Sequence, residues 1–186
     1  LTRATARLVG QVDGRAAYGG TPTDASVIAA IRAIRARGIA VTLYPFLAMD
    51  IAGDNTLPDP WGGVRQAAYP WRGRISCHPA AGVSGSVDRT AEARSQIEAF
   101  VGSVPVSAFS VVAGEVVCAR PDEWSFRRMI LHMAHLAVAA GGVEAFLIGS
   151  EFVGLNAVRD AADAYPFVEA LTDLATDVRD VLGAST

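Results

Sequence analysis

The chain has 186 residues, of which 51% are hydrophobic and 19% charged. This balance excludes an intrinsically disordered protein, and the lack of any short repeat excludes a collagen-like or coiled-coil one. A formal net charge of −3 excludes a strong field that would draw the protein to nucleic acid or to an anionic membrane, and no apolar run reaches the roughly 18 residues of a membrane span. We therefore expect one domain over residues 1–186, and, because the chain opens on Leu1, a fragment of a longer protein.

The first regular elements are predicted after residue 22. Residues 1–22 hold short apolar stretches broken by glycine and proline, which are typical of loose strands or loop. Asp24 can then cap a helix that ends at Gly38. The apolar residues at helical spacing on that helix are Val27, Ile28, Ile31 and Ile34. Residues 40–46 form a continuous apolar run, which indicates a strand buried on both faces of a parallel sheet.

A long segment over residues 50–89 shows neither helical nor strand periodicity. It is rich in glycine, proline and aspartate, and it also contains Trp61, Tyr69 and Trp71. Structureless connections beyond about 15 residues are uncommon unless they are functional or disordered, and aromatic residues are scarce in disordered chains. We expect an ordered excursion over the carboxyl end of the sheet.

Helices and strands alternate in the second half. Helices are predicted near residues 90–101 and 123–140 and from Pro166 onwards, a small hairpin over 110–118, and a second buried strand over 143–149. The residues expected to face inward on these helices are Ala93, Ile97, Phe100, Val101, Met129, Ile130, Met133, Leu136, Ala137, Val168, Leu171, Leu174, Val178 and Val181. The alternation indicates an α/β fold with a parallel sheet, either a small open sheet or a partial barrel, since a complete (β/α)₈ barrel takes ~250 residues.

Two carboxyl groups follow the two predicted strands. Glu151 comes directly after the second strand and Asp50 after the first, and the loop beyond adds Asp54 and Asp59. Parallel-sheet enzymes bind ligands at the carboxyl ends of strands, where a carboxylate can act as general acid or base, and glycoside hydrolysis needs two such groups. Glu151 could instead cap a helix or form an ion pair, and Asp50 could be a turn former.

The aromatic residues of the long loop lie close to two arginines. Trp61, Tyr69 and Trp71, together with Arg72 and Arg74, could form a sugar-stacking shelf edged with hydrogen-bond donors. The alternative is a small apolar core that holds the long loop in place.

The remaining reactive side chains favour neither a metal nor a cofactor. His132 and His135 could share one helix face, but without further ligands they are typical of partly buried helix histidines. Cys77 and Cys118 could pair or stay free. The chain contains no glycine-rich nucleotide-binding motif. We expect no metal and no cofactor.

Several blocks of sequence resemble a known family. They are TLYPF (residues 42–46), MD (49–50), LPDP (57–60), YPWRGRI (69–75), WSFRRMILH (124–132), AGGV (140–143), FLIGSE (146–151) and YPF (165–167). From about Ala17 to the end, the chain resembles the glycoside-hydrolase-like TIM-barrel domain of the large multidomain tail protein (baseplate hub, host specificity) of gene transfer agents and related prophages.

The resemblance implies a fold, a location and a role. The fold would be about the first half of a (β/α)₈ TIM barrel, in the tail of a phage-like particle made in the bacterial cytoplasm. Glu151 matches the acid/base position at the end of the fourth strand of barrel glycosidases, and the second carboxylate would lie on a later strand outside this chain. The implied activity is cleavage of cell-envelope glycan, either peptidoglycan or capsule. The residues expected to hold the sugar are Tyr44, Trp61, Tyr69, Trp71, Arg72 and Arg74.

The alternative function is a non-catalytic structural or glycan-binding barrel of the baseplate. An unrelated small α/β hydrolase is a third possibility, but the chain lacks a nucleophile motif for it. The expected partners are other tail or baseplate proteins and cell-envelope glycan. The open sheet edge of half a barrel further predicts self-association or a compensating partner chain.

Overall fold

The computed structural model describes residues 10–12, 15–17, 22–47, 49, 51–68, 70–120 and 122–183. These residues form two compact units that alternate along the chain. The first unit takes the described parts of Phe46–Val101 and Gly149–Asp173. The second takes those of Ala6–Pro45, Gly102–Ile148 and Leu174–Thr186.

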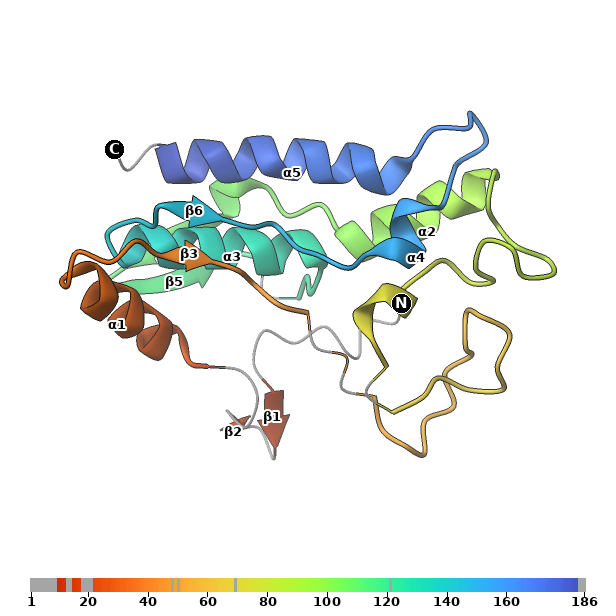
Figure 1. The fold of residues 1–186 in the computed structure, drawn as a ribbon, viewed down its shortest axis with the longest axis horizontal. Helices are drawn as coiled ribbons and strands as arrows, with labels where there is room; N and C mark the ends of the chain where they lie inside the picture. Colours follow the sequence, from red (N-terminus) through yellow and green to blue (C-terminus); the bar gives the residue numbers. More distant parts are fainter. Residues whose placement is uncertain are drawn as a thin grey trace. The chain divides into compact units, whose positions relative to one another are not determined.

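The second unit is built around a parallel pair of strands (Figure 1). β3 (Thr42–Leu43) pairs with β6 (Ala145–Phe146). The contact continues beyond the strands, because the backbone nitrogen of Leu147 donates to the carbonyl oxygen of Leu43 at 3.0 Å. The predicted parallel sheet is thus confirmed as a mixed α/β arrangement, and the strands of the described residues do not close into a barrel.

Both parallel strands are shorter than the sequence predicts. The apolar runs over 40–46 and 143–149 each contribute only two residues to the ladder. Tyr44 is 37% exposed and Leu147 39% exposed, so the expectation of burial on both faces is wrong. Continuous burial of parallel strands requires neighbours on both edges and helices on both faces. In a sheet of two strands, each strand has one hydrogen-bonded neighbour.

Two helices pack with the strands into the core of the second unit. α1 (Asp24–Arg35) and α3 (Phe126–Ala139) meet there. The buried members of this core are Ile28, Ile31, Val41, Leu136 and Ala140. Ile34, which we expected to face inward, is 38% exposed because it lies one turn beyond the α1 residues that reach the core.

The start of α1 differs from the prediction by one residue. Thr23 is the N-cap, and its Oγ1 accepts a hydrogen bond from the backbone nitrogen of Ser26 at 3.0 Å. Thr23 has the extended backbone that a capping residue requires. Asp24 lies inside the helix, and its carboxylate is 2.9 Å from Nε2 of His132 on α3. The expected capping residue therefore links two helices instead.

Short antiparallel hairpins complete the second unit. The predicted hairpin is confirmed as β4 (Phe109–Val112) and β5 (Glu115–Cys118), which follow η2 (Val106–Ala108). It contacts α3. A further hairpin joins β1 (Gly10–Val12) to β2 (Arg15–Ala17), within the region expected to hold loose strands.

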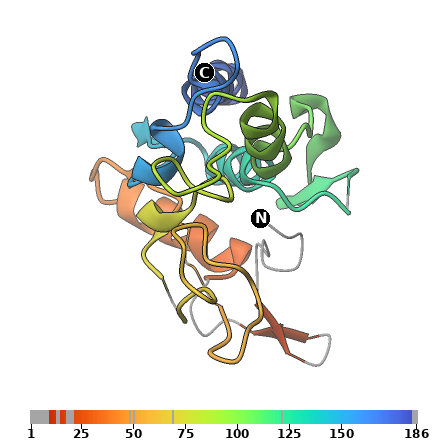
Figure 2. The same cartoon turned by 90° about the vertical axis from the view of Figure 1, so that its right-hand side faces the viewer.

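The first unit combines a long irregular segment with helices (Figure 2). Between residues 51 and 90, η1 (Arg72–Arg74) is the one helical turn among the described residues. The irregular excursion is confirmed, and its place relative to the sheet stays a prediction. α2 (Ala91–Val101), α4 (Val153–Asn156) and the beginning of α5 (Pro166–Gly183) follow. No helix in the described ranges combines the length and the apolar character needed to cross a membrane.

Three phenylalanines form the aromatic core of the first unit. The ring centroid of Phe152 lies 6.5 Å from that of Phe100 and 5.3 Å from that of Phe167. All four residues of α2 expected to face inward are buried. Val168 is 46% exposed, contrary to expectation, because the adjacent Phe167 occupies the buried position on α5.

We predict that Gly102→Ala destabilises the protein more than Gly114→Ala. Both glycines have left-handed backbones, with φ of 82° and 84°, and alanine costs roughly 1–2 kcal/mol in that conformation. A Cβ at residue 102 would also overlap the Ser125 side chain, whereas residue 114 faces open space. Overpacking adds about 1–3 kcal/mol. Urea unfolding of both variants measures the difference, and equal losses would contradict the packing argument.

Candidate functional site

Glu151 lies between β6 and α4 in the chain, outside any regular element. Its φ of 60° is in the left-handed region, which few residues other than glycine adopt. Backbone strain of this kind persists only where the surroundings fix it, and it concentrates at binding and active sites. The conformation therefore supports the interpretation of Glu151 as a site residue.

A glycine contact positions the long loop against the residues that follow Glu151. A Cβ on Gly154 of α4 would overlap the carbonyl oxygen of Ile75 and would lie 2.8 Å from the carbonyl oxygen of Gly73 in η1. The Ser76 hydroxyl donates to the carbonyl oxygen of Gly154 at 2.8 Å. Because only glycine lets the two backbones approach this closely, the sequence at residue 154 fixes η1 beside α4.

This packing brings two of the predicted sugar-binding residues to Glu151. Nε1 of Trp71 donates to Oε2 of Glu151 at 2.9 Å, and the guanidinium of Arg72 forms an ion pair with the same oxygen. Both interactions end on Oε2, so Oε1 accepts no hydrogen bond from the described part of the chain. The indole is 53% exposed and the Glu151 side chain 45% exposed.

Arg72 is held from three sides. Its Nε donates to the carbonyl oxygen of Leu47 at 3.0 Å, and its guanidinium carbon lies 3.6 Å from the ring centroid of Phe46. Only 15% of the side chain is exposed. A planar guanidinium stacked on an aromatic ring and hydrogen-bonded at its edge loses little further freedom when it binds a carboxylate. The pairing of Arg72 with Glu151 is therefore preorganised.

These donors stabilise the ionised form of Glu151. The hydrogen bond from Trp71 contributes most to lowering the pKa of Glu151. Desolvation, the next-largest effect, raises this pKa, and the hydrogen bond and the charge of Arg72 lower it further. Glu151 is thus a carboxylate at neutral pH. A general acid in glycoside hydrolysis needs a raised pKa instead, so this arrangement suits a hydrogen-bond acceptor or a base.

A second tryptophan and arginine form a separate cluster on the same loop. Nε1 of Trp61 donates to the carbonyl oxygen of Arg74 at 2.8 Å. The guanidinium of Arg74 donates to both carboxylate oxygens of Asp59, at 3.1 and 3.0 Å. The backbone nitrogen of Trp61 also donates to Asp59, at 3.0 Å. Both predicted residues thus pair with Asp59.

Of the three remaining predicted site residues, only Tyr44 lies within the described part of the chain. Tyr44 belongs to the second unit. Asp50 and Tyr69 lie outside the described residues, and their roles stay predictions. Sequence reasoning missed the supports of Arg72, which are Phe46 and the carbonyl of Leu47. The sequence indicated them only in a general way, because an arginine in an apolar loop needs a hydrogen-bond acceptor and an aromatic or apolar neighbour.

The histidines and cysteines have ordinary structural surroundings. His132 meets Asp24, and the ring of His135 stacks on Phe109 with centroids 5.0 Å apart. The described residues contain no group of three or more side chains that could hold a metal ion. Both cysteines are free thiols, and burial raises the pKa of Cys77 to about 11, which makes that thiol unreactive.

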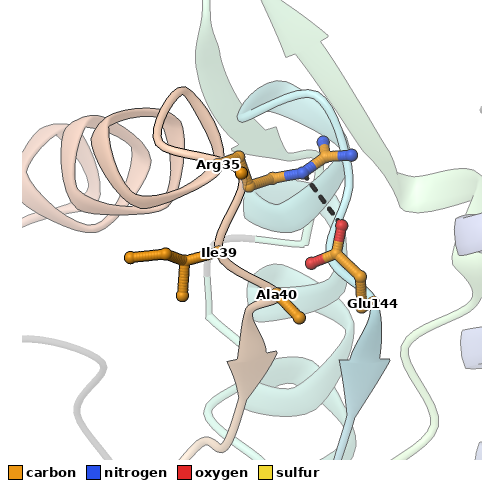
Figure 3. Close-up of a pocket in the computed structure, with 5 residues that line it drawn as sticks. Arg35, Ile39, Ala40 and Glu144 are labelled. Atoms are coloured by element: carbon orange, nitrogen blue, oxygen red, sulfur yellow. Dashed lines mark hydrogen bonds and ion pairs between the residues drawn. The ribbon is translucent and has the colours of Figure 1, made fainter.

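The second unit has a shallow depression of about 270 Å³ where its two parallel strands begin (Figure 3). Arg35 and Glu144 lie side by side there, with 3.2 Å between Nε and Oε1. The other oxygen of Glu144 accepts from the backbone nitrogen of Val41 at 2.6 Å. The charged groups thus pair with each other and with the backbone, an arrangement that joins the starts of the two strands.

Comparison with known proteins relates part of the chain to gene transfer agents. The family model described as the GTA (gene transfer agent) TIM-barrel-like domain matches residues 124–186, about a third of the chain. The matched range contains α3, β6, Glu151, α4 and α5. A search of curated proteins finds no match. The carboxyl-terminal third of the chain, Glu151 included, thus resembles a gene transfer agent TIM-barrel-like domain.

We predict that Trp71→Phe raises the pKa of Glu151. Phenylalanine keeps the aromatic ring and removes the N–H that contributes most to lowering this pKa. Because the folded-state pKa is depressed, the stabilising contribution of Glu151 is present above the ordinary value of 4.5 and is lost as the pH falls through the lower folded value. Titration of the Glu151 carboxyl carbon by NMR measures the change. An unchanged pKa in the variant would contradict the assignment.

Proposed function

We propose that this chain is part of a TIM-barrel-like domain in the tail of a gene transfer agent particle, and that it binds cell-envelope glycan. The family match over residues 124–186 supports the type of particle. The proposed binding groups are Glu151, Trp71 and Arg72. The observation that carries the proposal is an ionised carboxylate, held by an arginine, beside a tryptophan that is 53% exposed.

These groups match the chemistry of a sugar ring. A pyranose has an apolar face of C–H groups and a rim of hydroxyls. The indole of Trp71 offers a flat apolar surface for that face, and Oε1 of Glu151 offers an acceptor for a hydroxyl. Because Arg72 already fixes the carboxylate, little freedom is lost when the sugar binds.

Glycan cleavage is the second candidate function. The left-handed backbone of Glu151 and its position after β6 favour it, because strained residues at strand ends are typical of active sites. Glu151 would act as the acid/base, with a second carboxylate on a later strand or at Asp50. The lowered pKa requires that the bound glycan first displace the Trp71 or Arg72 contact, so that Glu151 can carry a proton.

The proposal places the chain among other tail proteins. In such a tail, the chain would contact neighbouring baseplate components. The two parallel strands have open edges within the described residues, and edges of this kind pair readily with further strands.

We predict that Glu151→Gln weakens binding to purified peptidoglycan by about tenfold or more, because a hydrogen bond to a charged group contributes roughly 1.5–3 kcal/mol. Glu98→Gln is the matched control, since Glu98 is 67% exposed and lies on α2. Cosedimentation with peptidoglycan and with a panel of capsular polysaccharides measures binding.

The same samples separate the two candidate functions. Soluble sugar released by the wild type but not by Glu151→Gln would establish cleavage. Binding without release would establish recognition alone. A wild type that neither binds nor releases any of these glycans would refute both functions.

A further inference from the structure

The same three kinds of side chain occur twice around η1. The indole of Trp71 and the guanidinium of Arg72 share the carboxylate of Glu151, and the guanidinium of Arg74 and the backbone nitrogen of Trp61 share that of Asp59. The two arginines flank Gly73 within one helical turn, and each one binds a different carboxylate. This repetition is independent of the strand-end position that first singled out Glu151.

Both indoles pack against the glycines at which η1 and α4 meet. A Cβ on Gly73 would overlap the six-membered ring of Trp71. A Cβ on Gly154 would lie 3.2 Å from Cζ2 of Trp61 and 2.8 Å from the carbonyl oxygen of Gly73. Both rings therefore approach the place where η1 meets α4 in the first unit.

Each indole is fixed in direction and open to solvent. The N–H of Trp61 is bound by the Arg74 carbonyl and that of Trp71 by Glu151, which holds each ring in one orientation. Trp61 is 36% exposed and Trp71 53% exposed. Exposed aromatic rings with a fixed orientation cost little conformational entropy when a ligand stacks on them.

The two clusters differ in the acceptors that they leave free. Arg74 engages both oxygens of Asp59, whose side chain is only 16% exposed. Glu151 keeps Oε1 available and is 45% exposed. The Trp71 cluster can therefore stack on a sugar and accept a hydroxyl, whereas the Trp61 cluster contributes mainly a stacking surface.

We propose that the two clusters are adjacent saccharide subsites, so that the ligand is a neutral glycan strand of at least two sugar units. This inference rests on the proposed glycan binding, and it adds the length and the charge class of the ligand. In each cluster one arginine pairs with one carboxylate, so no net charge faces the ligand. Such a surface suits hydroxyls and amides, and it gives a polyanion such as nucleic acid no attraction.

The experiment uses the whole chain and compares its affinity for saccharides of two lengths. The probes are N-acetylglucosamine and its β1,4-linked tetramer, and the tetramer has the linkage of the peptidoglycan backbone. Isothermal titration calorimetry measures their affinities. Two-dimensional ¹H–¹⁵N spectra follow the three indole N–H signals, of which Trp124, in the second unit, is the internal control.

We expect the monomer to shift the Trp71 signal alone, and the tetramer to shift the signals of Trp71 and Trp61. The tetramer should bind about three- to tenfold more tightly than the monomer, the size of one additional aromatic contact. Trp61→Leu should bring the affinity for the tetramer down to that for the monomer. Trp61→Phe, which keeps an aromatic face, should restore part of the tetramer's advantage.

Two negative outcomes are distinguishable. If the chain binds peptidoglycan but the tetramer has no advantage, or if Trp61→Leu preserves that advantage, the second subsite is refuted and the proposed function stands. If the folded wild type binds neither peptidoglycan nor the tetramer, the proposed function and this inference both fail. If the Trp124 signal of Trp61→Leu also moves, that variant is misfolded and Trp61→Phe decides instead. A tetramer advantage as large in Trp61→Phe as in the wild type then refutes the second subsite.

Discussion

The close approach of two backbones at Gly73 and Gly154 is the constraint on which the candidate site depends. No other residue type fits at 154 without displacing a carbonyl oxygen of the neighbouring turn. Because the long segment before α2 has almost no regular structure of its own, this contact and the hydrogen bond from Ser76 anchor it beside α4. The contacts of Trp71 and Arg72 with Glu151 therefore depend on glycine at these two positions.

The ion pair at Glu151 differs in character from the exposed ion pairs of the chain. Exposed pairs on α2, such as Arg94 with Glu98, have geometry that contributes little to stability. Arg72 is mostly buried against Phe46 and the Leu47 carbonyl, and its partner remains open to solvent. A preorganised cation beneath an accessible anion is an arrangement that favours ligand binding over stability alone.

Much of the secondary structure could be predicted, and the tertiary contacts could not. The inward faces of α2 and α3 and the hairpin of β4 and β5 follow from local periodicity, which the sequence carries directly. The lengths of β3 and β6 depend on how many strands neighbour them, and the cap at Thr23 depends on backbone angles. The residue pattern alone predicts neither the lengths of these strands nor the capping residue.

The candidate site was predictable in composition but not in pairing. Glu151 was identified from its place after an apolar run, and the tryptophans and arginines from their density in one loop. Which arginine meets which carboxylate depends on the glycine contact between segments about 80 residues apart in the chain. The predicted roles of Asp50 and Tyr69 stay predictions, because both residues lie outside the described part of the chain.

The engagement of a single oxygen of Glu151 has a stereochemical consequence. Trp71 and Arg72 both bind Oε2, so the carboxylate is held at the edge of the exposed indole and Oε1 is left to offer its lone pairs to a ligand. In the proposed glycan complex, a sugar stacked on that ring would bring one of its hydroxyls to this oxygen. Epimers that differ in the orientation of that hydroxyl would therefore present different partners to the same acceptor, and the site would distinguish hexoses by handedness at a single carbon.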